Sequence, residues 1–129
     1  MKDLINKFVN IEKELSEDKG SFSLFALFLR EDAPGVWDLV VAAPWLYLDK
    51  QEGIRIISEA IRYKLSQEEL KKLSRIVIID RENPALEGLH QAIQTEHFSI
   101  EVKDSNFFGL QIKHAFLITS VRESKIQVT

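Results

Sequence analysis

The strongest hydrophobic pattern in the chain is a pair of apolar runs, residues 22–29 and 36–43, joined by Ala33-Pro34-Gly35-Val36. The Pro-Gly pair suits positions i+1 and i+2 of a type II turn, because the proline ring presets φ and glycine accepts a positive φ. The pattern therefore predicts a β-hairpin. The first run is apolar on both faces, and strands of that kind are normally covered on both sides. We expect a sheet with helices packed over it.

Apolar residues at helical spacing, together with capping residues, predict four helices. The first covers residues 3–16, with Glu12 among the polar residues opposite its apolar stripe and Gly20 placed to cap its C-terminal end. The other three begin at residues whose side chains can accept an N–H from the first helical turn, namely Asp49, Ser66 and Asn83.

Three further segments predict strands. Residues 75–80 contain four consecutive β-branched residues without alternation, which is typical of a buried strand with a parallel neighbour. Residues 98–103 alternate, which places Phe98 inward. The segment 104–106 is turn-forming, and residues 110–120 predict a long final strand.

The predicted element order is α-β-β-α-α-β-α-β-β, within a single domain over residues 1–129. This order indicates an α/β (α+β-like) fold with a five-stranded mixed sheet and helices packed on it. A right-handed crossover would place the strand at 75–80 parallel to the one at 36–43. The order of the strands across the sheet does not follow from the sequence.

The charge and composition favour a cytoplasmic protein. The chain has no cysteine, a formal net charge of −3 and a pI of about 5.6, so bulk attraction to nucleic acid or anionic lipid is not expected. No signal peptide is apparent, and the apolar run at 39–48 is too short to span a bilayer. The residues from about Glu123 onward are expected to be frayed.

Asp80 is a candidate ligand-binding residue because it directly follows a predicted strand. In open α/β sheets, ligands bind beyond the carboxyl ends of the strands, where a carboxylate can contact a hydroxyl group or a metal. A turn or capping role is the simpler explanation for an aspartate at this junction. Glycine-rich phosphate-binding loops between a strand and a helix are absent from the sequence, and the identity of any cofactor does not follow from it.

Glu101-Val102-Lys103 matches the Glu-x-Lys of metal-dependent nucleases, in which a carboxylate holds a divalent cation and a lysine stabilises developing charge. Asp80 would supply the second carboxylate. Simple alternation also explains the pattern, because it places Glu101 and Lys103 on a solvated strand face. The predicted helix between Asp80 and Glu101 departs from the nuclease arrangement, which has a strand hairpin there.

The histidines allow two interpretations. His90 lies beside apolar residues of a predicted helix, and His114 is a candidate ligand-binding residue on a strand. If both faced one cavity with Asp80, they would complete a metal site of two nitrogens and one carboxylate. A hydrogen-bonded core or sheet-edge histidine is the simpler explanation. The residues expected to share the strand face of His114 are Leu110, Ile112, Phe116 and Ile118.

Asp38 and the aromatic residues around the second strand are further candidates for a ligand pocket. Asp38 lies on a largely apolar face, where an acid can titrate unusually, but its closeness to the turn favours projection past the sheet rim into water. Trp37, Trp45 and Tyr47 bracket the strand and are suited either to a pocket wall or to ordinary core packing. His97 lies in a predicted loop and indicates no role.

Phe107 and Phe108 form a candidate partner-binding surface, because two aromatic residues in a predicted turn are hard to bury together. Packing under a neighbouring helix is the alternative. The sequence contains no Gly-x-Ser-x-Gly motif and no cysteine nucleophile.

The stretch from Gly35 to Trp45, followed by a capped helix and by Ser74 to Asp80, resembles a group of small uncharacterised prokaryotic α/β proteins. The similarity covers most of the chain but implies no activity and no site residues.

The sequence therefore favours a non-catalytic cytoplasmic binding or regulatory domain for a protein partner or a small ligand, as a homodimer. The alternative is a metal-dependent hydrolase or nuclease that uses Asp80, Glu101 and Lys103.

Overall fold

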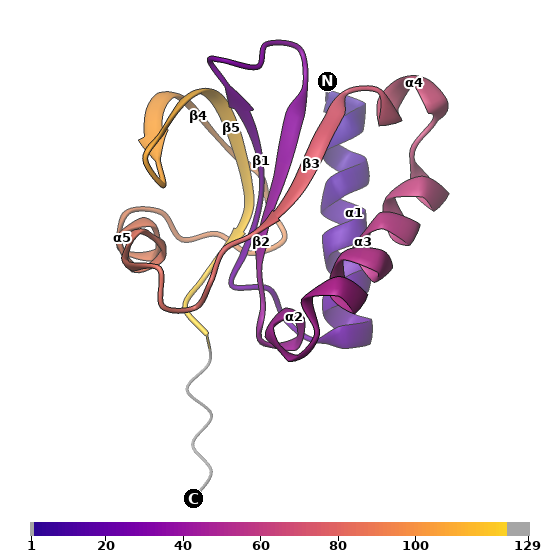
Figure 1. The fold of residues 1–129 in the computed structure, drawn as a ribbon, viewed down its shortest axis with the longest axis horizontal. Helices are drawn as coiled ribbons and strands as arrows, with labels where there is room; N and C mark the ends of the chain where they lie inside the picture. Colours follow the sequence, from indigo (N-terminus) through magenta and orange to yellow (C-terminus); the bar gives the residue numbers. More distant parts are fainter. Residues whose placement is uncertain (1, 124–129) are drawn as a thin grey trace, which may run out of the picture.

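A single mixed sheet separates two helical layers in the computed structural model, which describes residues 2–123 (Figure 1). The fraying expected beyond Glu123 lies outside these residues. The elements, in chain order, are α1 (Lys2–Lys19), β1 (Leu24–Arg30), β2 (Trp37–Ala42), α2 (Pro44–Leu48), α3 (Lys50–Lys64), α4 (Gln67–Leu70), β3 (Leu73–Ile78), α5 (Pro84–Ala92), β4 (Ile100–Phe107) and β5 (Leu110–Ser120).

The five strands lie in the order β3-β2-β1-β5-β4, which confirms the mixed α/β sheet. β2 and β3 are parallel, as the right-handed crossover predicts, and the other pairs are antiparallel. β1 is the central strand: Leu27 pairs with Leu39 of β2 and with Phe116 of β5. The strand that is apolar on both faces is therefore the one with a neighbour on each side and a helical layer over each face.

The two faces of the sheet carry separate cores. On the face covered by α1 and α3, Phe25 and Leu27 are fully buried and pack with Phe8 and Ile57 of the helices. On the opposite face, α5 covers the other side chains of the same strands; the buried residues there include Ala26, Phe28, Val40, Leu86 and Leu89. Each large apolar side chain that is fully buried contributes about 1.5–3 kcal/mol to folding.

Local sequence signals determine the helix starts. The Asp49 carboxylate accepts the Glu52 N–H at 3.1 Å, and Ser66 forms a complete capping box at the start of α4. Asn83 caps α5, with Pro84 at the first helical position. Gly35 has φ +87°, as the type II turn requires.

Two sequence predictions about strand ends are wrong. The segment predicted as a turn at 104–106 belongs to β4, and the chain reverses instead at Phe108 and Gly109, which have φ +54° and +78°. Phe98 is 71% exposed rather than inward-facing, because β4 begins only at Ile100.

β3 differs from its prediction in a way that matters for function. Its β-branched run indicated a buried strand, but β3 lies at the edge of the sheet and is half-exposed. Only Ile79, just after the strand, is buried. An apolar edge strand beside α3 is therefore accessible to other molecules.

Candidate functional site

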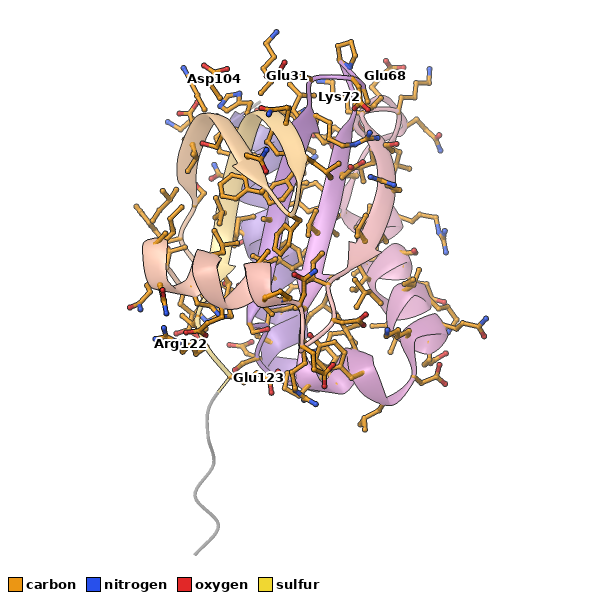
Figure 2. The ribbon with its side chains drawn as sticks, turned by 60° about the vertical axis from the view of Figure 1, so that its left-hand side comes forward. Glu31, Glu68, Lys72, Asp104, Arg122 and Glu123 are labelled. Atoms are coloured by element: carbon orange, nitrogen blue, oxygen red, sulfur yellow. The ribbon has the colours of Figure 1, made fainter. Side chains whose placement is uncertain are left out.

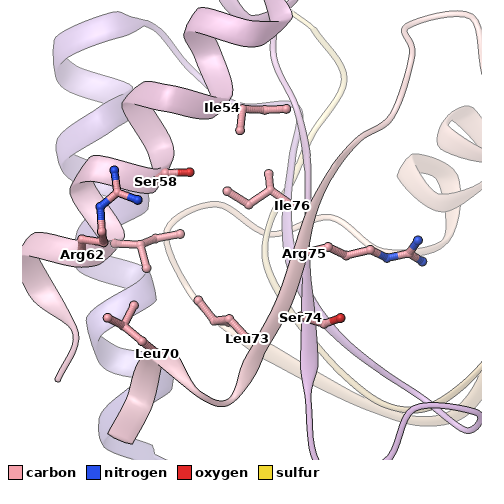
Figure 3. A pocket seen from close by; sticks show the side chains of 9 residues that line it. Ile54, Ser58, Arg62, Leu70, Leu73, Ser74, Arg75 and Ile76 are labelled. Atoms are coloured by element: carbon pink, nitrogen blue, oxygen red, sulfur yellow. The ribbon is translucent and has the colours of Figure 1, made fainter. Parts of the chain in front are cut away.

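A cavity of about 330 Å³ lies between α3 and the free edge of β3 (Figure 3). We call this cavity and the adjoining strand edge the β3 groove. Cavities of about 300–1,000 Å³ are typical of ligand-binding sites. The residues that line it are Ile54, Ser58, Ile61, Arg62, Leu70, Leu73, Ser74, Arg75 and Ile76.

The helical side of the β3 groove follows from the periodicity of α3. Ile54, Ser58 and Arg62 are spaced by four residues, so they share one face of the helix. Figure 3 shows Ile54 and Ser58 pointing toward Ile76 on β3, with the Arg62 side chain running along the helix. Ile54 is 37% exposed although it is a large apolar residue, because no strand lies beyond β3 to cover it.

The strand side of the β3 groove offers backbone as well as side chains. The Ile79 N–H donates to the Val41 carbonyl at 2.9 Å, and Val77 pairs with Val40. Because the backbone groups of a parallel strand bond alternately to one side and the other, those of Ile76 and Ile78 point away from β2. Their side chains belong to the α1–α3 face. The same residues therefore present free backbone groups and apolar side chains.

The charges around the β3 groove are uneven. Its lining includes two arginines and no carboxylate. Arg62 lies on the α3 side, whereas the Arg75 side chain points away from Ile54 and Ile76, toward the opposite face of the sheet (Figure 3). The rim is therefore basic on both faces of the strand edge.

Asp38 anchors this edge from the inside. Its side chain accepts from Arg30 Nε at 2.8 Å and lies 3.2 Å from Arg75 Nε. The expectation that Asp38 projects into water is wrong: the residue is 2% exposed, because an arginine from each neighbouring strand reaches its carboxylate. The two ion pairs compensate the buried carboxylate, since a charged group is normally buried only when it is paired and hydrogen-bonded.

The residues of the alternative metal site are not brought together. Asp80 lies beyond the end of β3 and pairs with Lys50 at 2.6 Å, whereas Glu101 and Lys103 lie on β4. These strands are the two edges of the sheet, four strand spacings or roughly 19 Å apart along it. Within residues 2–123, no group of three or more His, Cys, Asp or Glu side chains is placed to hold a metal ion.

The two candidate histidines also lie apart. His90 is 4% exposed on α5, and its Nε2 lies 2.9 Å from the Ser23 carbonyl, so it is a hydrogen-bonded core histidine. His114 contacts Glu101 of the neighbouring strand through Nε2. The expectation that His114 shares a face with Ile112 is wrong. A register shift makes Lys113 an extra residue, which turns His114 to the α1–α3 face.

The aromatic residues around β2 lie in three different environments. Trp37 is 6% exposed and packs on His114, with ring centroids 5.7 Å apart. Trp45 packs edge-on against Phe22 at 5.6 Å, and the Tyr47 hydroxyl donates to a backbone carbonyl at 2.8 Å. Both belong to α2, a helix that the sequence analysis did not predict. They do not form one pocket wall with Asp38.

Phe107 and Phe108 are half-buried rather than an exposed pair. Their rings stack on Phe28 with centroid distances of 5.2 and 6.4 Å, and both pack against the α5 face of the core. The partner-binding surface predicted for them therefore has no exposed aromatic pair to support it.

One polar cluster was missed by sequence reasoning. Glu12 is fully buried, contrary to its expected place on the polar face of α1, and its carboxylate accepts from Ser16 and Thr119 at 3.0 and 2.8 Å. His97 Nδ1 lies 2.5 Å from the same carboxylate, and the His97 backbone N–H donates to Thr119 Oγ1. The cluster holds the loop before β4 against α1, and His97 has φ +58° there. Residues this far apart in sequence give no local signal.

A scan against protein-family models gave no match, and searches of curated proteins and of solved structures found no similar protein. The resemblance to small prokaryotic proteins stays a prediction. None of the helices within residues 2–123 is long and apolar enough to cross a membrane.

Proposed function

We propose that this protein is a binding domain that captures an extended segment of a partner protein at the β3 groove. The observation that supports this best is an apolar edge strand with free backbone groups at Ile76 and Ile78, beside a cavity of about 330 Å³. In strand addition, backbone hydrogen bonds supply affinity and pockets for alternate side chains supply specificity.

The partner segment follows from the chemistry of the two faces. Side chains of an added strand alternate between the faces of the sheet. Those on the α3 side would enter the cavity next to Ile54 and Ile76 and should be apolar. Those on the other side would lie near Arg75 and should be acidic, and Arg62 favours an acid at the end of the cavity. We therefore propose a segment in which apolar and acidic residues alternate.

A second copy of the chain is the competing occupant, because the sequence analysis favours a homodimer. Pairing β3 with itself would bring Arg75 and Lys72 of both copies to one interface, where each Arg75 has only the Asp38 carboxylate that it shares with Arg30. Like charges across neighbouring strands are destabilising. Charge complementarity therefore favours a different, acidic partner over a second copy.

The test is a titration with a short capped peptide in which Ile or Val alternates with Asp or Glu, followed by NMR of the ¹⁵N-labelled protein. We expect saturable shifts at the amides of Ile76 and Ile78. Ile76→Lys places a charge on the edge and should weaken binding at least about tenfold, whereas Ile76→Val keeps the apolar shape and should change it less than about twofold.

Charge is tested by Arg62→Glu, which should weaken binding roughly threefold, with Arg55→Glu as the matched control on the same helix. Arg55 pairs with Glu52 and Glu59 on the exposed side of α3, outside the cavity lining. Equal effects of both substitutions, or shifts that avoid β3, would refute the proposal. Sedimentation that shows strong self-association, abolished by Ile76→Lys, would assign the edge to a second copy instead.

A further inference from the structure

A second cavity, independent of the β3 groove, lies at the opposite end of the sheet. Its volume is about 460 Å³, and its polar lining comes from four parts of the chain: Ser23, Arg81, Glu87, His90, Arg122 and Glu123. We call it the strand-end cleft. It lies beyond the carboxyl ends of β2 and β3, where open α/β sheets bind their ligands. Figure 2 shows Arg122 and Glu123 at the end opposite Glu31 and Asp104.

Arg81 is held in a fixed orientation in this cleft. Its guanidinium lies over the Tyr47 ring, 4.8 Å from the centroid, and its Nε donates to Glu123 at 2.8 Å. The Tyr47 hydroxyl in turn donates to the Ile79 carbonyl. Burial raises the pKa of Tyr47 to about 12, so the hydroxyl keeps its proton at neutral pH. A guanidinium stacked and bonded in this way has lost much of its freedom before any ligand arrives.

Arg122 supplies a second oriented guanidinium. Its Nε and Nη2 donate to the Glu87 carboxylate at 3.0 and 2.6 Å, which anchors the side chain to α5. The hydrogen bonds from Arg122 lower the pKa of Glu87, so this carboxylate stays charged. Behind it, His90 is buried and bonded to the Ser23 carbonyl.

Both guanidinium groups have N–H donors that remain available to a ligand. Among residues 2–123, the two terminal nitrogens of Arg81 and Nη1 of Arg122 have no hydrogen-bond partner. An arginine donates through five N–H groups in a fork that matches carboxylate and phosphate oxygens. A ligand oxyanion must compete with the carboxylates that already pair with the two arginines. Arg122 donates to Glu87 through two nitrogens, whereas Arg81 donates to Glu123 through Nε alone.

We propose that the strand-end cleft binds a small molecule that carries a phosphate or carboxylate group, and that Glu123 is an internal competitor for Arg81. The ligand oxyanion accepts from the free nitrogens of Arg81 and Arg122 and displaces the Glu123 carboxylate. This site goes beyond the partner binding proposed for the β3 groove and does not depend on it.

If Glu123 competes with the ligand for Arg81, substitutions at these two residues should change the affinity for an anion in opposite directions. Glu123→Gln keeps the size of the side chain but removes its charge, so it should tighten anion binding about tenfold. Arg81→Gln should weaken binding at least about tenfold, because the stacked guanidinium is lost. The probes are inorganic phosphate and succinate, each titrated at constant ionic strength and followed by NMR.

Glu82→Gln is the matched control for net charge. Both glutamates raise the pKa of Arg81. Glu123 acts chiefly through its hydrogen bond, whereas Glu82 acts more weakly and through its charge alone, so Glu82→Gln removes the same charge without breaking a hydrogen bond to Arg81. The control should therefore change affinity less than about twofold. Binding of only one probe would identify the oxyanion. No saturable binding of either probe to the wild-type protein and Glu123→Gln would overturn the proposal, as would equal effects of Glu82→Gln and Glu123→Gln. Spectra that match the wild-type spectrum away from the cleft would establish that each variant is folded.

Discussion

The two edges of the sheet, β3 and β4, are built in opposite ways. β4 alternates, and its exposed Glu101 and Lys103 place charge along the edge; Asp104 adds an irregular φ of +50°. β3 carries no charged side chain after Arg75, and from that residue its register against β2 runs without a shift. Charges and irregular backbone are the devices by which natural edge strands avoid pairing with other chains.

This difference shows that the exposed backbone of β3 is not an unavoidable consequence of ending a sheet. The same chain protects one edge and leaves the other apolar. The open edge lies beside the β3 groove and α3, whereas the cavity next to the end of β4 is lined by α5 together with Asn106 and Phe107. An open β3 edge beside a protected β4 edge is the arrangement that the proposed strand addition at β3 requires.

The largest expected effect concerns how each edge is anchored. Asp38 is buried between Arg30 and Arg75, so Asp38→Ala leaves two arginines without their shared partner. We expect it to lower the free energy of unfolding by about 3 kcal/mol, the low end of the range for broken buried pairs, because Arg75 is half-exposed. Glu101→Ala removes an exposed partner of His114 and should cost less than about 1 kcal/mol. Urea denaturation of both variants measures the difference.

Equal losses of stability in the two variants would show that the edges are anchored alike. Asp38→Asn serves as a second variant, because it keeps the shape and some hydrogen bonds of the side chain. If the ion pairs anchor β3, the free energy of unfolding of Asp38→Asn should lie between that of the wild-type protein and that of Asp38→Ala.

The hairpin, the capped helices and the parallel crossover could be predicted because each rests on neighbouring residues. Asp49, Ser66 and Asn83 signal their helix starts within three residues, and Pro34-Gly35 signals the turn. These signals survive in any tertiary context that keeps the helices and strands.

The position of β3 at the edge could not be predicted in the same way. A run of four β-branched residues has the same sequence whether a fifth strand, a helix or a partner covers it, and strand order is set by packing between distant elements. The ion pairs of Asp38 and the contact between Glu12 and His97, 85 residues apart, are equally invisible to local patterns. The strand-end cleft was missed for the same reason, although Asp80, predicted as a ligand-binding residue, lies at the same end of the sheet as this cleft.

A second prediction concerns the charges that protect the β4 edge. Replacing Glu101 and Lys103 by valine removes the charges of β4 and should create concentration-dependent self-association, measured by sedimentation velocity. The matched control replaces Lys13 and Glu17 by valine, since both are exposed residues of α1 rather than of a strand. If both double variants associate equally, lost charge rather than the open edge is responsible.

The smallest expected effect lies within β3 itself. The Val77 N–H bonds to β2, whereas the amides of Ile76 and Ile78 point away from the sheet. Amide hydrogen exchange should therefore be at least about tenfold slower at Val77 than at its two neighbours, because exchange at a bonded amide requires local opening. When the alternating peptide binds, Ile76 and Ile78 should slow toward the rate of Val77, and the amides of β4 should not change. Slow exchange at all three residues without peptide would mean that something already pairs with this edge, and sedimentation of the same sample would show whether it is a second copy of the chain.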